Sequence, residues 1–470
     1  MINLNQFRGQ TMAVMGLGKS GLATARALRK AGVRVLAWDD SEARRETVAR
    51  EGIKVADLAD VSWADIDALV LSPGIPHRFP APHPVAEMAL DAGCPIISDI
   101  QLLAHAAPDA CFIGITGTNG KSTTTSLIGH LLAKTGRHAA IGGNLGRPVL
   151  DLDKMSEGEF YVIEMSSFQL EITAPVPFDI AVLLNVTPDH LERHGGMDGY
   201  VAAKKRVFDG QRKDHAAIVG IDDGICRSIF EALGAAKHQR VLPISGERRV
   251  AGGVYAVDRV LYDDTEGRNT PILGLDEIHT LPGTHNAQNA SAAYATARIA
   301  GLTPAEIRDA MRSFPGLAHR QELAAEIDGV LYVNDSKATN ADAAARALSS
   351  YTNIYWIAGG QQKEDGLAAA LPYVDHVRHA FLIGQAADPF AAALEGKTEV
   401  TVAHTLADAV PAAHEKAQRD KRPGTVVLLS PACASYDQFS NFEERGLEFC
   451  RLVSNLPGAN RNIRNFGDAA

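Results

Sequence analysis

The sequence contains few cysteines and few aromatic residues. Its five cysteines lie far apart and form no CxxC pair, so we expect reduced thiols rather than a disulfide framework or a zinc site. Aromatic residues account for only 6% of the chain. The core must therefore be built mainly from Ala, Val, Leu and Ile.

Basic residues do not outnumber acidic ones. The chain has 46 Lys and Arg against 56 Asp and Glu, which gives a formal net charge of -10. This balance disfavours a nucleic-acid-binding protein, because such proteins normally carry a basic surface. Binding of an anionic ligand would require a local concentration of Lys, Arg, helix N-termini or metal ions.

Long apolar runs are missing as well. No run approaches the ~20 residues that span a bilayer. Residues 1–10 lack the basic and apolar regions of a secretory signal. We therefore expect a cytoplasmic protein that does not insert into a membrane.

Short apolar strands alternate with Gly-containing turns and helices, a pattern typical of α/β folds with doubly wound parallel sheets. The polar stretch 240–268 instead predicts a few antiparallel strands at a sheet edge. Strands are expected at residues 11–15, 33–38, 111–115, 160–163, 180–185, 330–333, 354–358, 380–383 and 425–429.

At 470 residues the chain is too long for one ordinary core, and its length suggests about three domains. The best candidate boundaries lie near Asp99, before a second glycine-rich unit, and near Gly316. The expected domains are therefore residues 1–99, 100–316 and 317–470.

The first glycine cluster, Gly16 to Gly21, reads Gly-Leu-Gly-Lys-Ser-Gly and fits GxGxxG between a strand and a helix. Asp39 and Asp40 end the next strand about 20 residues later, which completes a dinucleotide-binding fingerprint. Such glycines let the backbone approach a diphosphate at a helix N-terminus. The pattern leaves open an NAD enzyme, another phosphate ligand, or a doubly wound domain that binds neither.

The second glycine-rich loop reads GITGTNGKST from Gly114, follows a buried strand and opens a helix, which is the context of a P-loop. It departs from the strict GxxxxGK[ST] pattern because Ile115 stands where glycine is expected. In such a loop, backbone N–H groups hold phosphate oxygens and Lys121 would neutralise the β- and γ-phosphates of ATP. The hydroxyl of Ser122 or Thr123 would reach Mg²⁺. The alternative is a glycine turn with a chance lysine.

Two possible metal ligands follow neighbouring strands. Glu164 ends the strand 160–163, and His190 comes after the strand that begins at Ile180. In a parallel sheet both positions fall on the carboxyl edge, where ligands bind. A lone Glu or His is usually only a satisfied polar group, but two such residues downstream of a P-loop predict a metal site.

Seven sequence strings occur in an order that resembles the Mur ligases, and the resemblance covers nearly the whole chain. The first string is also found in folylpolyglutamate synthases, whereas the last two are long and are similar to the branch of the family that adds D-glutamate. The strings are TGTNGKST, EMSSFQLE, NVTPDHLERH, GTHNAQN, GLAHR, NDSKATN and SPACASYDQFSNFEERG.

The resemblance implies a fold of three domains. N- and C-terminal Rossmann-like domains would flank a central P-loop domain that binds ATP. The N-terminal domain would hold a uridine diphosphate rather than NAD, with the segment SPGI as a second contact. The residues implied in contacts to this substrate are Gly16, Gly18, Lys19, Ser20, Asp39, Ser72 and Gly74.

The resemblance also implies an ATP-dependent reaction of UDP-N-acetylmuramoyl-L-alanine with D-glutamate. The substrate carboxylate would attack the γ-phosphorus of ATP to give an acyl phosphate, which the amine of D-glutamate would then attack. Two Mg²⁺ ions are implied, with Ser122, Thr123 and Glu164 at the first metal and phosphate positions and His190 at the second metal position.

Lys204 matches a family lysine that is carbamylated by CO₂. The carbamate would be an anionic oxygen ligand for the Mg²⁺ shared with His190. The alternative is an exposed helical lysine, and the adjacent Lys205 makes a misassignment easy. Lys204 is preferred because it follows two alanines, as in the family pattern.

The remaining implied residues belong to ATP, to the acceptor substrate and to the amino acid. The sequence around Lys363 departs from the expected glycine-rich string. Asn144 would contact phosphate or the muramoyl substrate, and Lys337 would act near the reacting groups with Lys121, His190 and Lys204. The implied ATP contacts are Gly117, Thr118, Asn119, Gly120, Lys121, Ser122, Thr123, Asn286, Asn289, Arg320 and Asp335, and the implied D-glutamate contacts are Thr339, Lys363, Ser435 and Phe442.

Three other interpretations stay open. The first glycine cluster would suit an NAD-dependent oxidoreductase, although that leaves the lysine loop unexplained. A P-loop switch or binding module without catalysis would not require Glu164 and His190. A family member that adds another amino acid is opposed only by the two C-terminal strings. We expect a monomer with no nucleic-acid partner.

Overall fold

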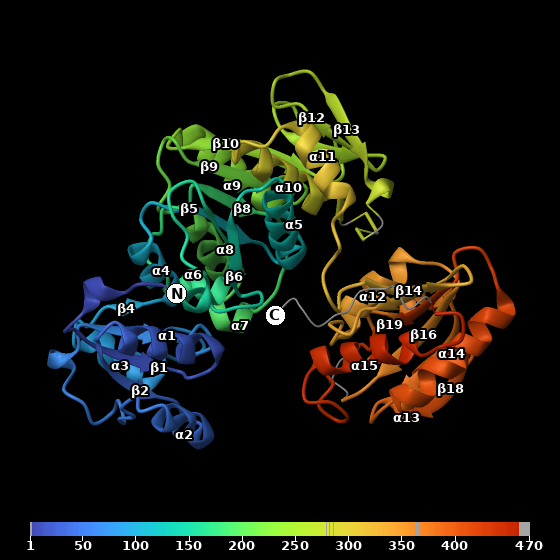
Figure 1. The fold of residues 1–470 in the computed structure, drawn as a ribbon, viewed down its shortest axis with the longest axis horizontal. Coiled ribbons are helices and arrows are strands. Elements are labelled where there is room, and N and C mark those ends of the chain that lie inside the picture. The colour runs from blue at the N-terminus through green and yellow to red at the C-terminus, as the bar shows by residue number, and fades with distance from the viewer. Residues whose placement is uncertain (1, 279, 282, 285, 362–365, 460–470) are drawn as a thin grey trace. The chain divides into compact units, whose positions relative to one another are not determined.

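The computed structural model describes residues 2–278, 280–281, 283–284, 286–361 and 366–459 (Figure 1). The chain separates into two compact units, the first formed by Met1–Ile278 with His285–Phe314 and the second by His279–Thr284 with Pro315–Ala470. The first unit holds two sheets and the second unit holds one. Mostly parallel sheets with helical crossovers confirm the expected α/β class.

The first sheet has four parallel strands in the order β2-β1-β3-β4. Its first three strands are short apolar runs that are buried along most of their length, as parallel strands covered by helices require, and the two residues of the fourth strand are half-buried. The elements are β1 (Thr11–Met15), α1 (Lys19–Lys30), β2 (Arg34–Trp38), α2 (Glu42–Arg50), β3 (Ala68–Leu71), α3 (Pro84–Asp91), β4 (Ile96–Ile97) and α4 (Asp99–Ala106).

The second sheet has nine strands in the order β13-β12-β11-β10-β9-β8-β5-β7-β6. Its strands are β5 (Cys111–Thr116), β6 (Ala139–Gly143), β7 (Phe160–Glu164), β8 (Ile180–Leu183), β9 (Ala216–Gly220), β10 (Arg240–Ser245), β11 (Val254–Val257), β12 (Val260–Asp263) and β13 (Thr270–Gly274). Its helices are α5 (Lys121–Lys134), α6 (Ser167–Ile172), α7 (Leu191–His194), α8 (Met197–Lys205), α9 (Gly224–Ala236), α10 (Asn286–Ile299) and α11 (Pro304–Arg312).

The expectation of a few antiparallel strands at a sheet edge within 240–268 is confirmed for β12 and wrong for β10. β12 pairs antiparallel with β11 and β13 at the sheet edge, but β10 is parallel to both β9 and β11. For β9 and β10 the reason is the helical crossover α9, which returns the chain to the same end of the sheet before β10 begins. The last four residues of β10 are buried, but the polar residues that follow them made the whole stretch look like an exposed sheet edge in the sequence.

The two sheets of the first unit share part of their core. Helices α1 and α4 contact the 3₁₀ turn Val149–Asp151, which follows β6. Val149 and Leu150 are buried in the same apolar cluster as Leu28 and Ile100. These contacts join the first sheet to the second within one compact unit.

The second unit contains one six-stranded sheet in the order β14-β15-β19-β16-β17-β18. β14 pairs antiparallel with β15, and the other pairings are parallel. Apolar clusters lie on both faces of this sheet. The elements are β14 (Glu322–Ile327), β15 (Val330–Asn334), α12 (Ala341–Ser350), β16 (Ile354–Gly359), β17 (Val377–Ile383), α13 (Ala387–Leu394), β18 (Glu399–His404), α14 (Leu406–Asp420), β19 (Val426–Leu429) and α15 (Phe442–Ser454).

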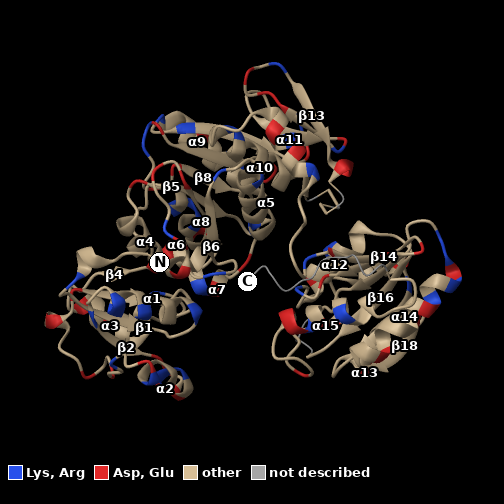
Figure 2. Cartoon of the chain, in the orientation of Figure 1, with Lys and Arg blue, Asp and Glu red and all other residues tan. Residues whose placement is uncertain are grey.

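Acidic and basic residues are interspersed over the helices and loops of both units (Figure 2). Within the described part of the chain, every helix is too short or too polar to cross a bilayer.

Candidate active site

The candidate site begins at the carboxyl edge of the nine-stranded second sheet, here called the central sheet. β5 lies between β7 and β8, and the three strands are parallel. Ile115 pairs with Glu164, and Thr116 pairs with Leu183, so the strands end nearly level with one another. The segments that follow them therefore start at one edge, where open α/β sheets bind their ligands.

The loop between β5 and α5 is held from two sides. The backbone N–H of Thr118 donates to the Asn185 carbonyl at 2.9 Å, and that of Asn119 donates to Oδ1 of Asn185 at 2.8 Å. Gly120 has a φ of 83°, and a Cβ at this position would lie 2.1 Å from Oδ1 of Asn289. Only glycine satisfies both demands, so the segment after β8 and helix α10 together determine the shape of the loop.

Two lysine ammonium groups meet at the carbonyl of Gly117. Lys121 donates from Nζ to the carbonyls of Gly117 and Thr118, both at 2.9 Å, and Lys204 donates to that of Gly117 at 2.8 Å. Lys204 is only 1% exposed, whereas Lys205 is exposed. Burial, together with the charge of Lys121, lowers the pKa of Lys204 to about 7. This loop therefore concentrates positive charge in an acidic protein, as phosphate binding requires.

The next two residues, Ser122 and Thr123, lie in the first turn of α5. Ser122 is buried and Thr123 is half-buried. The N-terminus of this helix carries backbone N–H groups and the positive end of the helix dipole, which favour a phosphate group. The two hydroxyls are thus at the place where a P-loop presents oxygen ligands to Mg²⁺.

Glu164 is buried at the end of β7, next to Asn144. Its Oε1 accepts a hydrogen bond from Nδ2 of Asn144 at 2.6 Å, and the Glu164 carbonyl accepts from the Asn144 N–H at 2.9 Å. Its Oε2 is buried and has no hydrogen-bond partner among the described residues. A buried carboxylate oxygen without a partner is costly, and a cation bound there would satisfy it.

His190 precedes α7 and is more exposed to solvent than the other predicted metal ligands, Ser122, Thr123, Glu164 and Lys204. Its side chain is 52% exposed, its backbone is left-handed with a φ of 52°, and Nε2 lies 3.4 Å from Oδ2 of Asp189. The imidazole ring packs 4.9 Å from the ring of Phe168. In the described ranges, no three or more His, Cys, Asp or Glu side chains form a cluster that could hold a metal ion.

Helix α10 brings the two predicted asparagines to the first turns of α5. Asn286 and Asn289 are both buried, and Nδ2 of Asn289 donates to Oδ1 of Asn286 at 2.9 Å. Oδ1 of Asn289 accepts from the hydroxyl of Thr124 at 3.3 Å. These asparagines therefore lie beside the loop, although they come more than 160 residues later in the sequence.

The first glycine cluster forms a closed turn against the loop after β3. The hydroxyl of Ser72 donates to the Gly16 carbonyl at 2.7 Å. A Cβ at Gly21 would lie 1.8 Å from that same carbonyl oxygen, so the turn and α1 approach too closely for any side chain. At Gly18 and Gly74, by contrast, an added Cβ would meet no described atom within 4 Å. These two positions face open space that a ligand could fill.

The carboxylate of Asp39 is buried and accepts hydrogen bonds from the backbone on either side of it in the sequence. Its Oδ2 accepts from the backbone N–H of Leu17 at 2.6 Å, and its Oδ1 accepts from that of Ser41 at 2.8 Å. Although burial opposes ionisation, these hydrogen bonds and Arg44 lower the pKa of Asp39. Arg45 packs over the ring of Trp38 at 4.5 Å. Two arginines thus stand beside the predicted substrate turn; Lys19 and Ser20 begin the helix that follows it.

In the second unit, Asp335 follows β15 and is buried. Its Oδ2 accepts from the hydroxyl of Ser430 at 2.8 Å, and its Oδ1 accepts from the N–H of Gln321 at 3.2 Å. Burial raises the pKa of Asp335 to about 7. The predicted Arg320 lies directly before Gln321, and its charge partly opposes this rise in pKa.

The predicted Lys337 and Phe442 are brought together in this unit. Nζ of Lys337 lies 5.1 Å from the Phe442 ring, and the hydroxyl of Ser336 donates to the Phe442 carbonyl at 2.8 Å. The buried guanidinium of Arg445 donates to the Ser336 carbonyl at 2.9 Å and to the Cys433 carbonyl at 3.1 Å. Arg445 therefore ties the segment after β15 to the segment after β19.

The other predicted amino-acid contacts lie near these segments. Thr339 is half-buried, and its N–H donates to the Lys337 carbonyl at 2.9 Å. Ser435 is buried, and its carbonyl accepts from the N–H of Phe439 at 2.8 Å. Lys363 lies outside the described residues.

Three further residues, Tyr200 and Arg193 in the first unit and Arg445 in the second, were not predicted from the sequence. Tyr200 places its hydroxyl 3.0 Å from Oγ1 of Thr118, Arg445 is buried, and Arg193 forms a partly buried ion pair with Glu171. The two arginines do occur in the strings DHLERH and NFEERG. Arginine in a polar string normally predicts an exposed side chain, so only the tertiary structure reveals their role.

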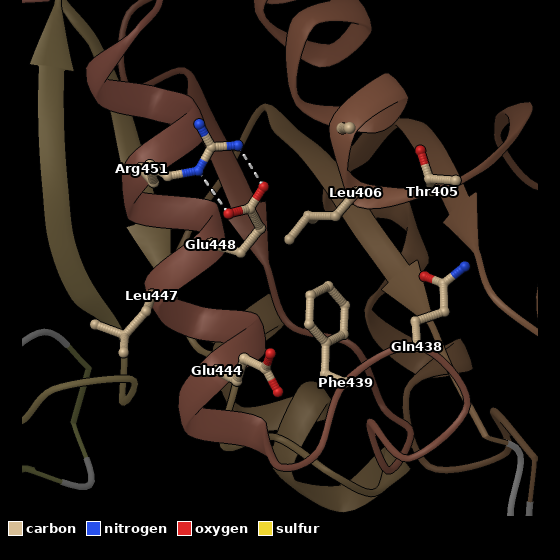
Figure 3. Close-up of a pocket in the computed structure, with 9 residues that line it drawn as sticks. Thr405, Leu406, Gln438, Phe439, Glu444, Leu447, Glu448 and Arg451 are labelled. Carbon is tan, nitrogen blue, oxygen red and sulfur yellow. Dashed lines mark hydrogen bonds and ion pairs between the residues drawn. The ribbon is translucent and has the colours of Figure 1, made fainter.

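A pocket of about 800 Å³ lies in the second unit between the start of α14 and one face of α15 (Figure 3). Leu406 and Phe439 point toward one another there, and Glu448 is paired with Arg451. The described residues predicted for the site are not among those that line it. Its lining residues are Thr405, Leu406, Ala407, Gln438, Phe439, Glu444, Leu447, Glu448 and Arg451.

Sequence models of three known domains match the chain. The Mur ligase middle domain matches residues 115–297, and the Mur ligase, glutamate ligase domain matches residues 319–433. The NAD binding domain of D-isomer specific 2-hydroxyacid dehydrogenases matches residues 1–73. The third match agrees with the first sheet and its glycine turn, which many nucleotide-binding proteins share.

Curated relatives are similar over almost the full chain. A UDP-N-acetylmuramoylalanine--D-glutamate ligase from Rhodospirillum rubrum is 52% identical over 97% of both chains. A protein of the same name from Caulobacter vibrioides is 48% identical over 97% of this chain and 98% of its own.

Solved structures share the fold at lower identity. The alanine ligase MurC from Thermotoga maritima has a TM-score of 0.57 at 16% identity, covering 94% of this chain and 98% of its own. MurF from Acinetobacter baumannii has a TM-score of 0.54 at 20% identity, covering 83% and 86%. With two matching domain models and full-length relatives near 50% identity, the chain belongs to the Mur ligase family.

Proposed function

We propose that the protein is an ATP-dependent ligase that adds D-glutamate to UDP-N-acetylmuramoyl-L-alanine in peptidoglycan synthesis. The observation that carries this proposal is the full-length similarity to relatives of that name, at up to 52% identity. The cationic loop at Gly117 supports it, because the reaction must bring ATP and two anionic substrates together. We also propose that the enzyme acts as a monomer in the cytoplasm.

We propose that residues 1–99, 100–316 and 317–470 form three domains that bind different substrates. The first segment would hold the nucleotide sugar, the second would bind ATP and the third would bring the amino acid. The open positions at Gly18 and Gly74 support the first role. The remaining proposed contacts to the nucleotide sugar are Gly16, Lys19, Ser20, Asp39, Ser72 and Asn144.

The proposed chemistry proceeds in two steps. The terminal carboxylate of the nucleotide sugar attacks the γ-phosphorus of ATP, so that ADP leaves and an acyl phosphate forms. The neutral amine of D-glutamate then attacks the acyl carbon, and the tetrahedral intermediate collapses with loss of phosphate. Lys121 would stabilise charge on the transferred phosphoryl group, and Lys337 would act near the reacting groups. The proposed ATP contacts are residues 117–123, Asn286, Asn289, Arg320 and Asp335.

The described residues fit Mg²⁺ beside the loop. Mg²⁺ commonly takes one or two carboxylates together with phosphate oxygens and water, so three clustered acidic side chains are not required. We propose Ser122, Thr123 and Glu164 for one ion, because Oε2 of Glu164 is buried without a described partner. His190 and a carbamate on Lys204 would serve a second. When bound, the ions neutralise charge on the transferred phosphoryl oxygens.

Burial of Lys204 supports its carbamylation. A pKa lowered to about 7 leaves a substantial neutral fraction of the amine above neutral pH. The neutral amine adds to the carbon of CO₂, an N–C bond forms, and one proton is released. The resulting anion would replace one of the two like charges that now meet at Gly117.

The identity of the amino acid tests the proposed function directly. With UDP-N-acetylmuramoyl-L-alanine, ATP and Mg²⁺, we expect phosphate release and a product of increased mass with D-glutamate. L-Glutamate should be rejected, because inversion at the α-carbon swings the amine away from the acyl phosphate while the carboxylates stay held. Equal rates with both enantiomers, or a preference for L-lysine or a diamino acid, would contradict the proposal.

Lys121→Ala should lower kcat by about 10²–10³-fold, because a positioned charge beside the transferred phosphoryl group is lost. The fold should persist, as checked by circular dichroism. Lys134→Ala is the matched control, since Lys134 is an exposed lysine at the other end of the same helix. Near wild-type phosphate release by the Lys121 variant would rule out the assignment of this loop to ATP.

Lys204→Ala should be nearly inactive and should regain part of its activity with added acetate. A short carboxylate fits the space left by the carbamate and restores an oxygen ligand. Phosphate release measured against acetate concentration gives the result. Lys205→Ala serves as the control. If Lys205→Ala loses activity while Lys204→Ala keeps full activity, the carbamate would be assigned to Lys205 instead of Lys204.

Ser435→Ala should raise the KM for D-glutamate by one to a few decades and leave the KM for ATP nearly unchanged. Thr339, Lys363, Ser435 and Phe442 are the proposed contacts to D-glutamate, and loss of one donor to a buried carboxylate costs roughly 2–4 kcal/mol. Steady-state kinetics with each substrate varied in turn separate the two KM values. Ser454→Ala, at the exposed end of α15, is the control. Parallel changes in both KM values would refute the specific role.

A further inference from the structure

A partly buried ion pair lies close to His190 and has no role in the chemistry proposed above. Nη1 of Arg193 donates to Oε2 of Glu171 at 2.6 Å, and both side chains are 11% exposed. Two histidines flank the carboxylate: Nδ1 of His77 lies 3.7 Å from its Oε1, and Nδ1 of His194 lies 3.8 Å from its Oε2. A buried ion pair is weak support for stability by itself, because desolvation offsets the attraction. Its role is therefore judged from the segments that the two side chains connect.

The same guanidinium reaches the first sheet. Nη2 of Arg193 donates to the carbonyl of Ile75 at 3.2 Å. Ile75 ends the segment Ser72–Ile75 after β3, and Ser72 holds the carbonyl of Gly16 in the first glycine turn. Arg193 therefore connects the proposed nucleotide-sugar segment to the central sheet by a direct hydrogen bond.

The carboxylate partner belongs to the helix that follows Glu164. Glu171 lies on α6, whose start is fixed by a reciprocal cap in which Ser166 and Gln169 exchange hydrogen bonds with the backbone. Only Met165 separates Glu164 from this cap. A displacement of Glu171 along the axis of α6 would therefore be passed to the end of β7, where Glu164 stands.

His190 is joined to the same group of side chains. Arg193 lies three residues after His190, and its guanidinium carbon is 5.1 Å from the ring of Phe168. That ring also packs 4.9 Å from His190 and 5.5 Å from His194. Nε2 of His194 lies 3.0 Å from the hydroxyl of Ser167, the first residue of α6. One aromatic ring and one guanidinium thus hold the segment of His190 against α6.

Arginine is required for these two contacts because its planar fork presents separate N–H groups in fixed directions. One group points to Oε2 of Glu171 and another to the carbonyl of Ile75. A lysine carries the same charge at a single nitrogen and cannot reproduce this rigid spacing. Replacement by lysine therefore removes the connection while keeping the charge.

We propose that Arg193 is a positioning residue that couples binding of the nucleotide sugar to the arrangement of Glu164 and His190. A ligand that orders Ser72–Ile75 would fix the Ile75 carbonyl, and through Arg193 it would fix α6 and the segment of His190. Binding of the nucleotide sugar and of Mg²⁺ should then favour each other reciprocally. This inference rests on the proposed function, since it takes a nucleotide sugar and Mg²⁺ as the ligands.

Calorimetric titration without ATP tests the coupling in the absence of turnover. We expect saturating Mg²⁺ to tighten binding of UDP-N-acetylmuramoyl-L-alanine to the wild-type protein by about tenfold, within the usual range of coupling between two sites. In Arg193→Lys the factor should fall below about twofold. In steady-state assays the variant should also show a higher KM for the nucleotide sugar and an unchanged KM for D-glutamate.

Arg312→Lys is the matched control. Arg312 is a half-exposed arginine of the same unit and pairs with Glu277 at 2.7 Å. It should retain the wild-type coupling factor, and it also reports any association of the diphosphate with Mg²⁺ in solution, which is common to all variants. Thermal unfolding of each variant shows whether it is folded.

Glu171→Gln provides a second test if Arg193→Lys does not fold. Glutamine keeps an acceptor oxygen and the shape of the side chain but removes the charge, and we expect it to lower the coupling factor as well. If Arg193→Lys folds and its coupling factor is unchanged, the inference is overturned. If Arg193→Lys does not fold, an unchanged coupling factor in Glu171→Gln overturns it. A wild-type protein that binds and ligates the nucleotide sugar without coupling to Mg²⁺ would overturn it too and leave the proposed function intact. A wild-type protein that does not bind the nucleotide sugar would overturn both.

Discussion

Parallel pairing of β5 with β7 and β8 is the constraint on which the first unit depends. Because Ile115 is level with Glu164 and Thr116 is level with Leu183, three chain segments leave the sheet at one edge. The lysine loop, the buried carboxylate and the segment of His190 therefore all begin at the same edge of the sheet. A shift of one residue in this register would turn every side chain of a strand to the opposite face.

Positive charge is concentrated at the same edge. Two ammonium groups donate to one carbonyl, that of Gly117, and their repulsion adds to the burial that lowers the pKa of Lys204. Like charges held in a partly buried place are unfavourable until an anion joins them. A protein of net charge -10 can thus bind anionic substrates, because the relevant field is local rather than global.

Much of this could be predicted from the sequence, since strands, glycine turns and the lysine loop are local patterns. The α/β class was confirmed, and the assignment of carbamylation to Lys204, which is buried beside an exposed Lys205, stays a prediction. The parallel pairing of β10 and the contacts of Arg193 could not be predicted. Pairing direction depends on the crossover, and the partners of Arg193 lie 22 and 118 residues away in the sequence.

The contact between Gly120 and Asn289 has a consequence for the order in which the chain can fold. A Cβ at Gly120 would lie 2.1 Å from Oδ1 of Asn289, so α10 directly contacts the loop that it helps to shape. During synthesis the chain emerges from its N-terminus, and the loop is complete long before α10 exists. A nascent chain that stops short of Asn289 therefore contains every residue of the loop without the surface that fixes its shape.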